Sequence, residues 1–109
     1  MRPKIPDISL LQYLALGVLM TGERPGRAIR DTIAGFGVRR SRAAFYQFMA
    51  RLERDGLVEG WYAQVEIGDQ MVTERRYAIT AVGQRAWAQT RSFFEAADAI
   101  AGRARESNA

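Results

Sequence analysis

The chain has 109 residues, of which 48% are hydrophobic and 26% charged, a balance that predicts one soluble globular domain. It has 16 basic against 12 acidic residues, and the formal net charge of +4 favours a polyanionic partner such as nucleic acid. The sequence contains neither Cys nor His, which excludes disulfides, thiolate or imidazole metal sites, Cys nucleophiles and His-dependent triads.

An apolar stretch between Ile8 and Met20 predicts the first helix, after a loose N-terminal arm over residues 1–6. Either Asp7 or Ser9 can cap this helix. Its longest unbroken apolar run is seven residues, whereas a membrane span needs about 20. No signal-peptide cleavage site follows the stretch, so we expect a cytoplasmic protein.

Two further helices are predicted between residues 25 and 55. Pro25 suits the first position of the earlier helix, because its missing N–H costs nothing there, and glycines at 35 and 37 end that helix. Ser41 is a good N-cap for the next helix, which Gly56 stops. The apolar residues of this helix follow the i, i+3, i+4, i+7 pattern of a buried face: Phe45, Phe48, Met49 and Leu52.

From Leu57 the apolar residues alternate, which predicts a strand, a turn at Gly68-Asp69 and a returning strand over 72–79. Thr80 then caps a long helix over 81–104, and residues 102–109 are expected to fray. The predicted fold class is mainly α with a β-hairpin: a winged helix-turn-helix over residues 1–80 and a long C-terminal dimerisation helix over 81–109.

The basic residues are placed as a winged helix-turn-helix needs them for DNA. Residues 24–42 hold six arginines and one acid, a local charge of +5. Arg39, Arg40 and Arg42 gather at the start of the third helix, where the helix dipole also favours an anion, and Arg75 and Arg76 give the hairpin a second basic site. We expect these five to neutralise phosphates. The alternative is a set of solvated arginines near acids.

The third helix is expected to enter the major groove. Ser41, Ala43, Tyr46 and Gln47 lie at its N-terminal end or on its outer face, where Gln47 can read adenine and Tyr46 can bind a phosphate. The alternative is that Tyr46 packs half-buried against the hairpin and that Gln47 is merely solvated.

These residues resemble the PadR family of bacterial transcriptional regulators. The resemblance covers about residues 10–95. Its elements are Leu16-Gly17-Val18-Leu19, Pro25-Gly26, the third-helix string from Ser41 to Leu57 and the stretch Arg75-Arg76-Tyr77-Ala78-Ile79-Thr80 with Gly83. Two positions depart from the family pattern: Arg27 stands where an aromatic residue usually follows the glycine, and Gln47 where a proline often follows the tyrosine.

The resemblance implies a homodimer that binds an inverted-repeat operator and represses transcription, with a C-terminal helix at the dimer contact. The length of that helix points the same way, because one small domain cannot cover both of its sides. The expected interface residues are Leu11, Leu14, Phe93, Phe94, Ala97 and Ile100. In some family members a planar aromatic effector binds between the subunits, and Trp87 is either part of such a pocket or ordinary packing. No cofactor is expected.

Two other functions are alternatives to the regulator. A winged-helix module that binds a protein partner, such as an adaptor or antirepressor, would use the same fold without specific DNA binding. An enzyme is not expected, because the carboxylates near the hairpin, Glu66, Asp69 and Glu74, have no partner nucleophile or metal ligand.

Overall fold

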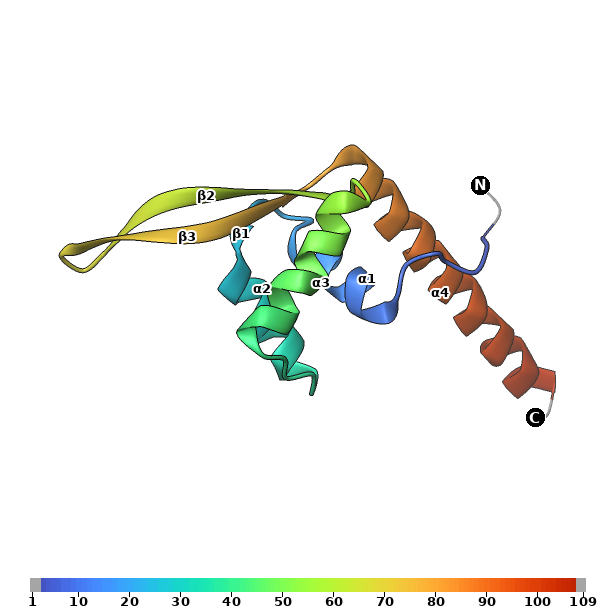
Figure 1. Cartoon of the computed structure of the whole chain (residues 1–109). Helices are drawn as coiled ribbons and strands as arrows, with labels where there is room; N and C mark the ends of the chain where they lie inside the picture. The colour runs from blue at the N-terminus through green and yellow to red at the C-terminus, as the bar shows by residue number, and fades with distance from the viewer. Residues whose placement is uncertain (1–2, 108–109) are drawn as a thin grey trace.

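The computed structural model describes residues 3–107, which form four helices and three strands (Figure 1). The elements in chain order are α1 (Leu10–Val18), β1 (Arg24–Pro25), α2 (Gly26–Gly35), α3 (Arg42–Arg54), β2 (Val58–Ile67), β3 (Gln70–Ile79) and α4 (Ala81–Ser107). The order of helices, hairpin and long last helix confirms the predicted fold class.

Ser9, rather than Asp7, caps α1. Its hydroxyl accepts a hydrogen bond from the Gln12 backbone N–H at 3.1 Å, and the Gln12 side chain accepts one from the Ser9 N–H at 2.9 Å. This reciprocal capping box satisfies two of the donors that a helix start leaves unpaired. Ala15 and Leu16 are fully buried, so α1 is the central helix of the core.

The helix-turn-helix pair is α2 and α3. Ile29 and Ile33 are the buried residues on the inner face of α2. Gly37, with φ of +90°, makes the turn after α2 in a conformation that favours glycine. Pro25 is the N-cap residue of α2 and not its first helical residue, a shift of one position from the prediction.

α3 is built as its sequence pattern predicts. The Ser41 hydroxyl accepts a hydrogen bond from the Ala44 N–H at 3.1 Å and caps the helix. Gly56, with φ of +74°, follows its C-terminal end. All four residues of the predicted apolar face are buried: Phe45, Phe48, Met49 and Leu52.

β2 and β3 form the predicted hairpin, which we call the wing, and β1 adds a short third strand. The wing runs in register from Val58 opposite Ile79 to Ile67 opposite Gln70. β1 pairs with β3 through Arg24 opposite Tyr77, which gives the sheet the order β1-β3-β2. β1 was not predicted, because a two-residue strand has no detectable periodicity in the sequence.

Thr80 and Gly83 join the wing to α4. The Thr80 hydroxyl donates to the Gly56 carbonyl oxygen at 2.6 Å and accepts from the Gly83 N–H at 3.0 Å. A Cβ at Gly83 would collide with the backbone carbonyl oxygen of Leu57. The Thr-x-x-Gly spacing therefore lets the start of α4 pack directly on the chain that connects α3 to β2.

The N-terminal arm, predicted over residues 1–6, is described from Pro3 onward, and residues 1–2 lie outside the described residues. Residues 3–5 are exposed, but the chain from Pro6 packs toward α4. Pro6 and Ile8 are half-buried, and both line a small pocket with residues of α4 that include Ala86 and Thr90. Thr90 is only 2% exposed, and its hydroxyl donates to the Ala86 carbonyl oxygen at 2.8 Å. The arm therefore covers one side of the first half of α4.

The described chain is elongated, because the wing and α4 project from the helical core in opposite directions (Figure 1). Its principal extents are 63 × 27 × 23 Å, and its radius of gyration is 17.0 Å. A compact chain of this length would have a radius of gyration of about 13 Å. α4 also extends to Ser107, beyond the predicted end at 104, so residues 102–107 are helical and not frayed; positions 108–109 of that prediction lie outside the described residues.

Candidate nucleic-acid interface

Three arginines lie unpaired at the N-terminal end of α3. Arg39, Arg40 and Arg42 are exposed, and none of them takes part in an ion pair within residues 3–107. The guanidinium carbon of Arg40 lies 5.8 Å from the centre of the Phe48 ring, and that of Arg42 lies 5.8 Å from the Tyr46 ring. The two rings therefore contact the arginine side chains by cation–π interaction, while the guanidinium groups remain exposed to solvent.

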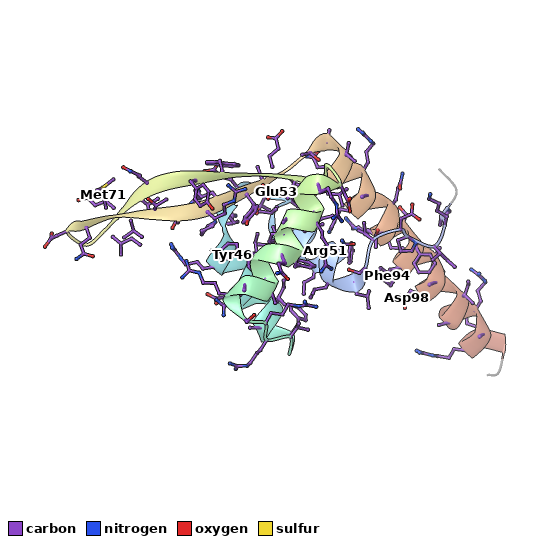
Figure 2. All side chains as sticks on the ribbon, in the orientation of Figure 1. Tyr46, Arg51, Glu53, Met71, Phe94 and Asp98 are labelled. Carbon is purple, nitrogen blue, oxygen red and sulfur yellow. The ribbon has the colours of Figure 1, made fainter. Side chains whose placement is uncertain are left out.

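The outer face of α3 is free for contact. Ala43, Gln47 and Ala50 are exposed, as the helical period predicts. Tyr46 is instead half-buried, with its ring 5.7 Å from that of Phe45, and Figure 2 shows it at α3 below the wing. Tyr46 is thus half-buried, as the alternative to DNA contact expects, while Gln47 is exposed. Phosphate contact by Tyr46 and base reading by Gln47 stay predictions.

Arg75 joins the wing to α3. Its Nη2 donates to Glu53 Oε1 at 2.6 Å, and its guanidinium carbon lies 4.7 Å from the Tyr62 ring and 5.7 Å from the Tyr77 ring. Burial alone would lower the pKa of Arg75, but hydrogen bonding to Tyr77 and the charge of Glu53 raise it overall. Arg75 therefore stays charged although only 21% of its side chain is exposed.

Arg76 belongs to a second ion-pair network, which is centred on Glu74. The two carboxylate oxygens of Glu74 accept hydrogen bonds from Arg27 Nη1, at 2.6 Å, and from Arg76 Nη1. Arg76 also forms an ion pair with Glu23, with 3.3 Å between Arg76 Nε and Glu23 Oε1. Burial raises the pKa of Glu74, but the bonds from Arg76 and Arg27 outweigh it and hold that pKa below its usual value.

The two wing arginines thus lie beside acids, as the alternative to phosphate binding expects, although their side chains are half-buried and not solvated. The Arg75–Glu53 pair ties the wing to α3. Arg76 pairs within β3 and with Glu23 before β1, while the link to α2 is the pair between Arg27 and Glu74. Phosphate contact by Arg75 and Arg76 stays a prediction.

The sequence analysis also missed a hollow of about 420 Å³ in the corner between α2, α3 and the wing. Arg27, Arg30, Arg42, Tyr46, Tyr62 and Arg75 are among its lining residues. One signal was available in the sequence: Arg27 stands where the family resemblance leads one to expect an aromatic residue. The hollow itself depends on three elements that meet only in the folded chain.

A second surface lies along α1 and α4. Leu11 and Leu14 are half-buried against the core, whereas Phe94 is 36% and Ile100 is 60% exposed. Phe93 and Ala97 are half-buried on the same helix as Phe94, whose position Figure 2 marks. The α4 residues of the expected dimer contact therefore keep apolar area open, while the two α1 leucines also serve the core of the monomer.

Trp87 packs in an aromatic cluster between α1 and α4. Its ring is stacked on that of Tyr13 at 5.7 Å, and Tyr13 lies 5.6 Å from Phe94. Trp87 and Tyr13 also line an open, mostly apolar groove of about 330 Å³ together with Gly17 and Val18. Trp87 thus has a packing role, and it is at the same time accessible from a groove.

The described part of the chain, residues 3–107, holds no group of three His, Cys, Asp or Glu side chains placed to bind a metal. Within the same residues, no helix combines the length and apolar character of a membrane span.

No protein-family model and no curated protein sequence matches the chain. Solved structures do match it. A PadR-family regulator from Clostridium difficile superposes with a TM-score of 0.72 at 13% identity, over 87% of this chain and 97% of that one. A PadR-family regulator from Eggerthella lenta gives 0.62 at 23% identity, over 88% and 81%.

Bacillus subtilis PadR, solved in complex with operator DNA, matches with a TM-score of 0.57 at 20% identity. That match covers 73% of this chain and 45% of the longer one. The class that these elements define is the winged helix-turn-helix with a long C-terminal helix. Within this class the chain has the fold of PadR-family transcriptional regulators, which confirms, at the level of the fold, the resemblance found in its sequence.

Proposed function

We propose that the protein is a DNA-binding transcriptional regulator of the PadR type. The observation that carries the proposal is the cluster of Arg39, Arg40 and Arg42, which are exposed and free of ion pairs at the start of α3 within the described chain. Arginine pairs well with phosphate and with guanine edges, and the helix dipole favours an anion at the same end. The likeness to a PadR solved with operator DNA supports the proposal.

In this proposal the protein acts as a homodimer through α4 and α1. Two copies present their α3 helices to successive major grooves, about 34 Å apart, so the operator is an inverted repeat. Ser41, Ala43 and Gln47 face the DNA with the three arginines, and the half-buried Tyr46 beside them donates its hydroxyl to a phosphate. Bound over a promoter, such a dimer would repress transcription by occupying the DNA.

A planar aromatic effector is a further part of the proposal. The groove beside Trp87 and Tyr13 offers ring faces for stacking at the surface where α1 and α4 meet. An effector bound there changes DNA affinity only if it binds one dimer geometry more tightly than the other.

The function is tested by selecting bound duplexes from a random pool at two salt concentrations. The expected result is a two-fold symmetric motif. Replacing Arg39 and Arg40 by Ala should weaken binding to all sequences and reduce the slope of log affinity against log salt by about 0.9 for each lost phosphate contact. The matched control removes two exposed α4 arginines, Arg85 and Arg103, and should leave the slope unchanged.

A second outcome of the same selection would contradict the proposed function. If no motif is enriched and the affinity for duplex DNA is that of any basic protein, the regulator is ruled out. The winged-helix module that binds a protein partner would then be the better account of the fold.

A further inference from the structure

The hollow between α2, α3 and the wing combines a concave shape with an excess of positive charge. Arg30 and Arg42 line it, and neither forms an ion pair with another described residue. Arg30 Nη2 donates to the Arg40 carbonyl oxygen at 3.2 Å, which holds its side chain against the N-terminal end of α3. Two uncompensated guanidinium groups therefore share one corner of the molecule.

The acidic residue in the lining does not cancel this charge. Glu74 is 8% exposed, and both of its oxygens accept hydrogen bonds from arginines. Arg27, whose Nη1 binds Glu74, keeps 61% of its side chain exposed and has further N–H groups to offer. Glu74 thus acts as a support that positions Arg27 at the rim of the hollow.

Neutral donors line the same corner. Tyr62 is 71% exposed and stands on β2, where Arg75 packs against its ring, so its hydroxyl is available while its ring is fixed. The first turn of α2 also lines the hollow, and its N-cap residue Pro25 supplies no side-chain hydrogen bond. The N–H groups at this helix start add to the donors, although they would not define a site by themselves.

We propose that this hollow seats a phosphodiester of the bound duplex, held by Arg30 and Arg42 with help from Arg27 and the Tyr62 hydroxyl. The inference rests on the proposed function. When α3 lies in a major groove and the wing lies along the adjoining minor groove, the sugar-phosphate strand between the two grooves crosses the corner between them. The hollow occupies that corner.

The seat joins elements that are distant in the sequence. Arg30 comes from α2, Arg42 from α3 and Tyr62 from the wing, so one phosphate fixes all three relative to the DNA. A phosphate contact reads no base. Loss of this contact should therefore lower the affinity for DNA without changing the sequence preference.

The first test compares two variants of equal charge, Arg30→Gln and Arg85→Gln, using a duplex carrying the selected motif. Binding is measured by fluorescence anisotropy across a salt series. Arg30→Gln should reduce the salt slope by about 0.9, whereas Arg85→Gln should leave it unchanged. Arg30→Lys keeps the charge and should restore most of the slope. Thermal melting of each variant checks that the fold is retained.

The second test identifies the phosphate itself. Neutral methylphosphonates replace single phosphates along the duplex, and one position should cost wild-type protein about tenfold in affinity. Arg30→Gln and Tyr62→Phe should each lose much of that penalty at this one position and at no other. Such coupling requires direct or neighbouring contact with the same phosphate.

If Arg30→Gln matches Arg85→Gln in slope, and no phosphate shows coupling to Arg30 or Tyr62, the seat is wrong. A slope change in the Arg39 and Arg40 double variant would still support the proposed function in that case. If wild-type protein shows no preference for duplex DNA, the proposed function and the seat both fail.

Discussion

At the scale of single residues, Glu74 shows how one carboxylate can organise a surface. It neutralises Arg76 inside the sheet and orients Arg27 at the edge of the hollow. A buried carboxylate is stable in its charged form only when hydrogen-bond donors replace the lost water. Here two guanidinium groups do so, and the low pKa of Glu74 follows.

This low pKa predicts a loss of stability in acid. A carboxyl group whose pKa is lower in the folded than in the unfolded chain stabilises the fold above its unfolded pKa. That contribution is lost as the pH falls through the folded pKa. Glu74→Gln should therefore lower the free energy of unfolding at pH 7 by about 1–3 kcal/mol, because two arginines lose a charged partner.

The measurement is denaturant unfolding at pH 7 and at low pH, with all proteins at one concentration. The difference between wild type and Glu74→Gln should shrink at low pH, where wild-type Glu74 is itself protonated. Glu95→Gln, which alters an exposed pair with Arg91, is the control and should change stability by only about 0–1 kcal/mol. An equal loss for both variants at pH 7 would contradict the role given to Glu74.

Two glycines in α4 give a second prediction at this scale. Gly83→Ala should destabilise the protein by about 1–3 kcal/mol, because the new methyl group meets the Leu57 carbonyl oxygen and a backbone atom cannot easily yield. Gly102→Ala meets nothing within 4 Å and should stabilise the helix by about 0.5–1 kcal/mol. Thermal unfolding of both variants measures the contrast, and a stabilising Gly83→Ala would refute the close packing of this joint.

At the scale of elements, the wing depends on α3 for its orientation. A two-stranded hairpin is marginal by itself, and most of the wing beyond Tyr62 is exposed. The contact that anchors it runs from Glu53, near the C-terminal end of α3, to Arg75 on β3 (Figure 2 labels Glu53). Gly60 makes room for this pair, because a Cβ there would collide with the Glu53 carboxylate.

Glu53→Gln should loosen the wing more than the rest of the molecule. The variant removes the charge partner of Arg75 but keeps the size of the side chain, so we expect a loss of about 1 kcal/mol in overall stability. Amide hydrogen exchange should become faster in β2 and β3 around Tyr62 and Arg75 while the protection of α1 changes little. Uniform exchange across both regions would show that the pair does not orient the wing.

At the scale of the whole molecule, the elongated shape leaves α4 without enough of the chain to cover it. The arm and α1 pack against its first half, whereas Phe94 and Ile100 stay exposed farther along. Phe93, Ala97 and Ile100 follow the i, i+4, i+7 spacing of one helix face, and Phe94 flanks that face. Exposed apolar area of this kind is the usual mark of an interface with another chain. The proposed dimer would cover them and set the distance between the two α3 helices.

The corresponding prediction concerns oligomeric state. Ile100→Asp together with Phe94→Asp should shift the protein to monomer, since two charges would be buried without partners. Sedimentation velocity measures the state, and DNA binding should weaken because one half-site is held at a time. Ala88→Asp changes an exposed residue on another side of α4 and should leave the dimer intact. A dimer that survives the double variant would place the interface elsewhere.

The sequence by itself determined the helices, the wing and the caps of α3 and α4, whereas it left the cap of α1 open and placed Pro25 one residue too far into α2. Ser41, Gly37 and Gly56 act on residues within a few positions of themselves, and the apolar faces of α2 and α3 repeat over a single turn or two. Such signals are local, so they can be read without knowing the rest of the fold. The winged-helix arrangement followed from their order.

Only the tertiary structure decided which arginines have an acidic partner. Arg27 and Glu74 are 47 positions apart, and Arg75 and Glu53 are 22 apart, so no local pattern connects them. Only in the folded chain do Arg75 and Arg76, which form ion pairs in the sheet, differ from Arg30 and Arg42, which form none with a residue between 3 and 107. Charge counts are fixed by sequence, but the free energy of each charge depends on the neighbours and the burial that folding gives it.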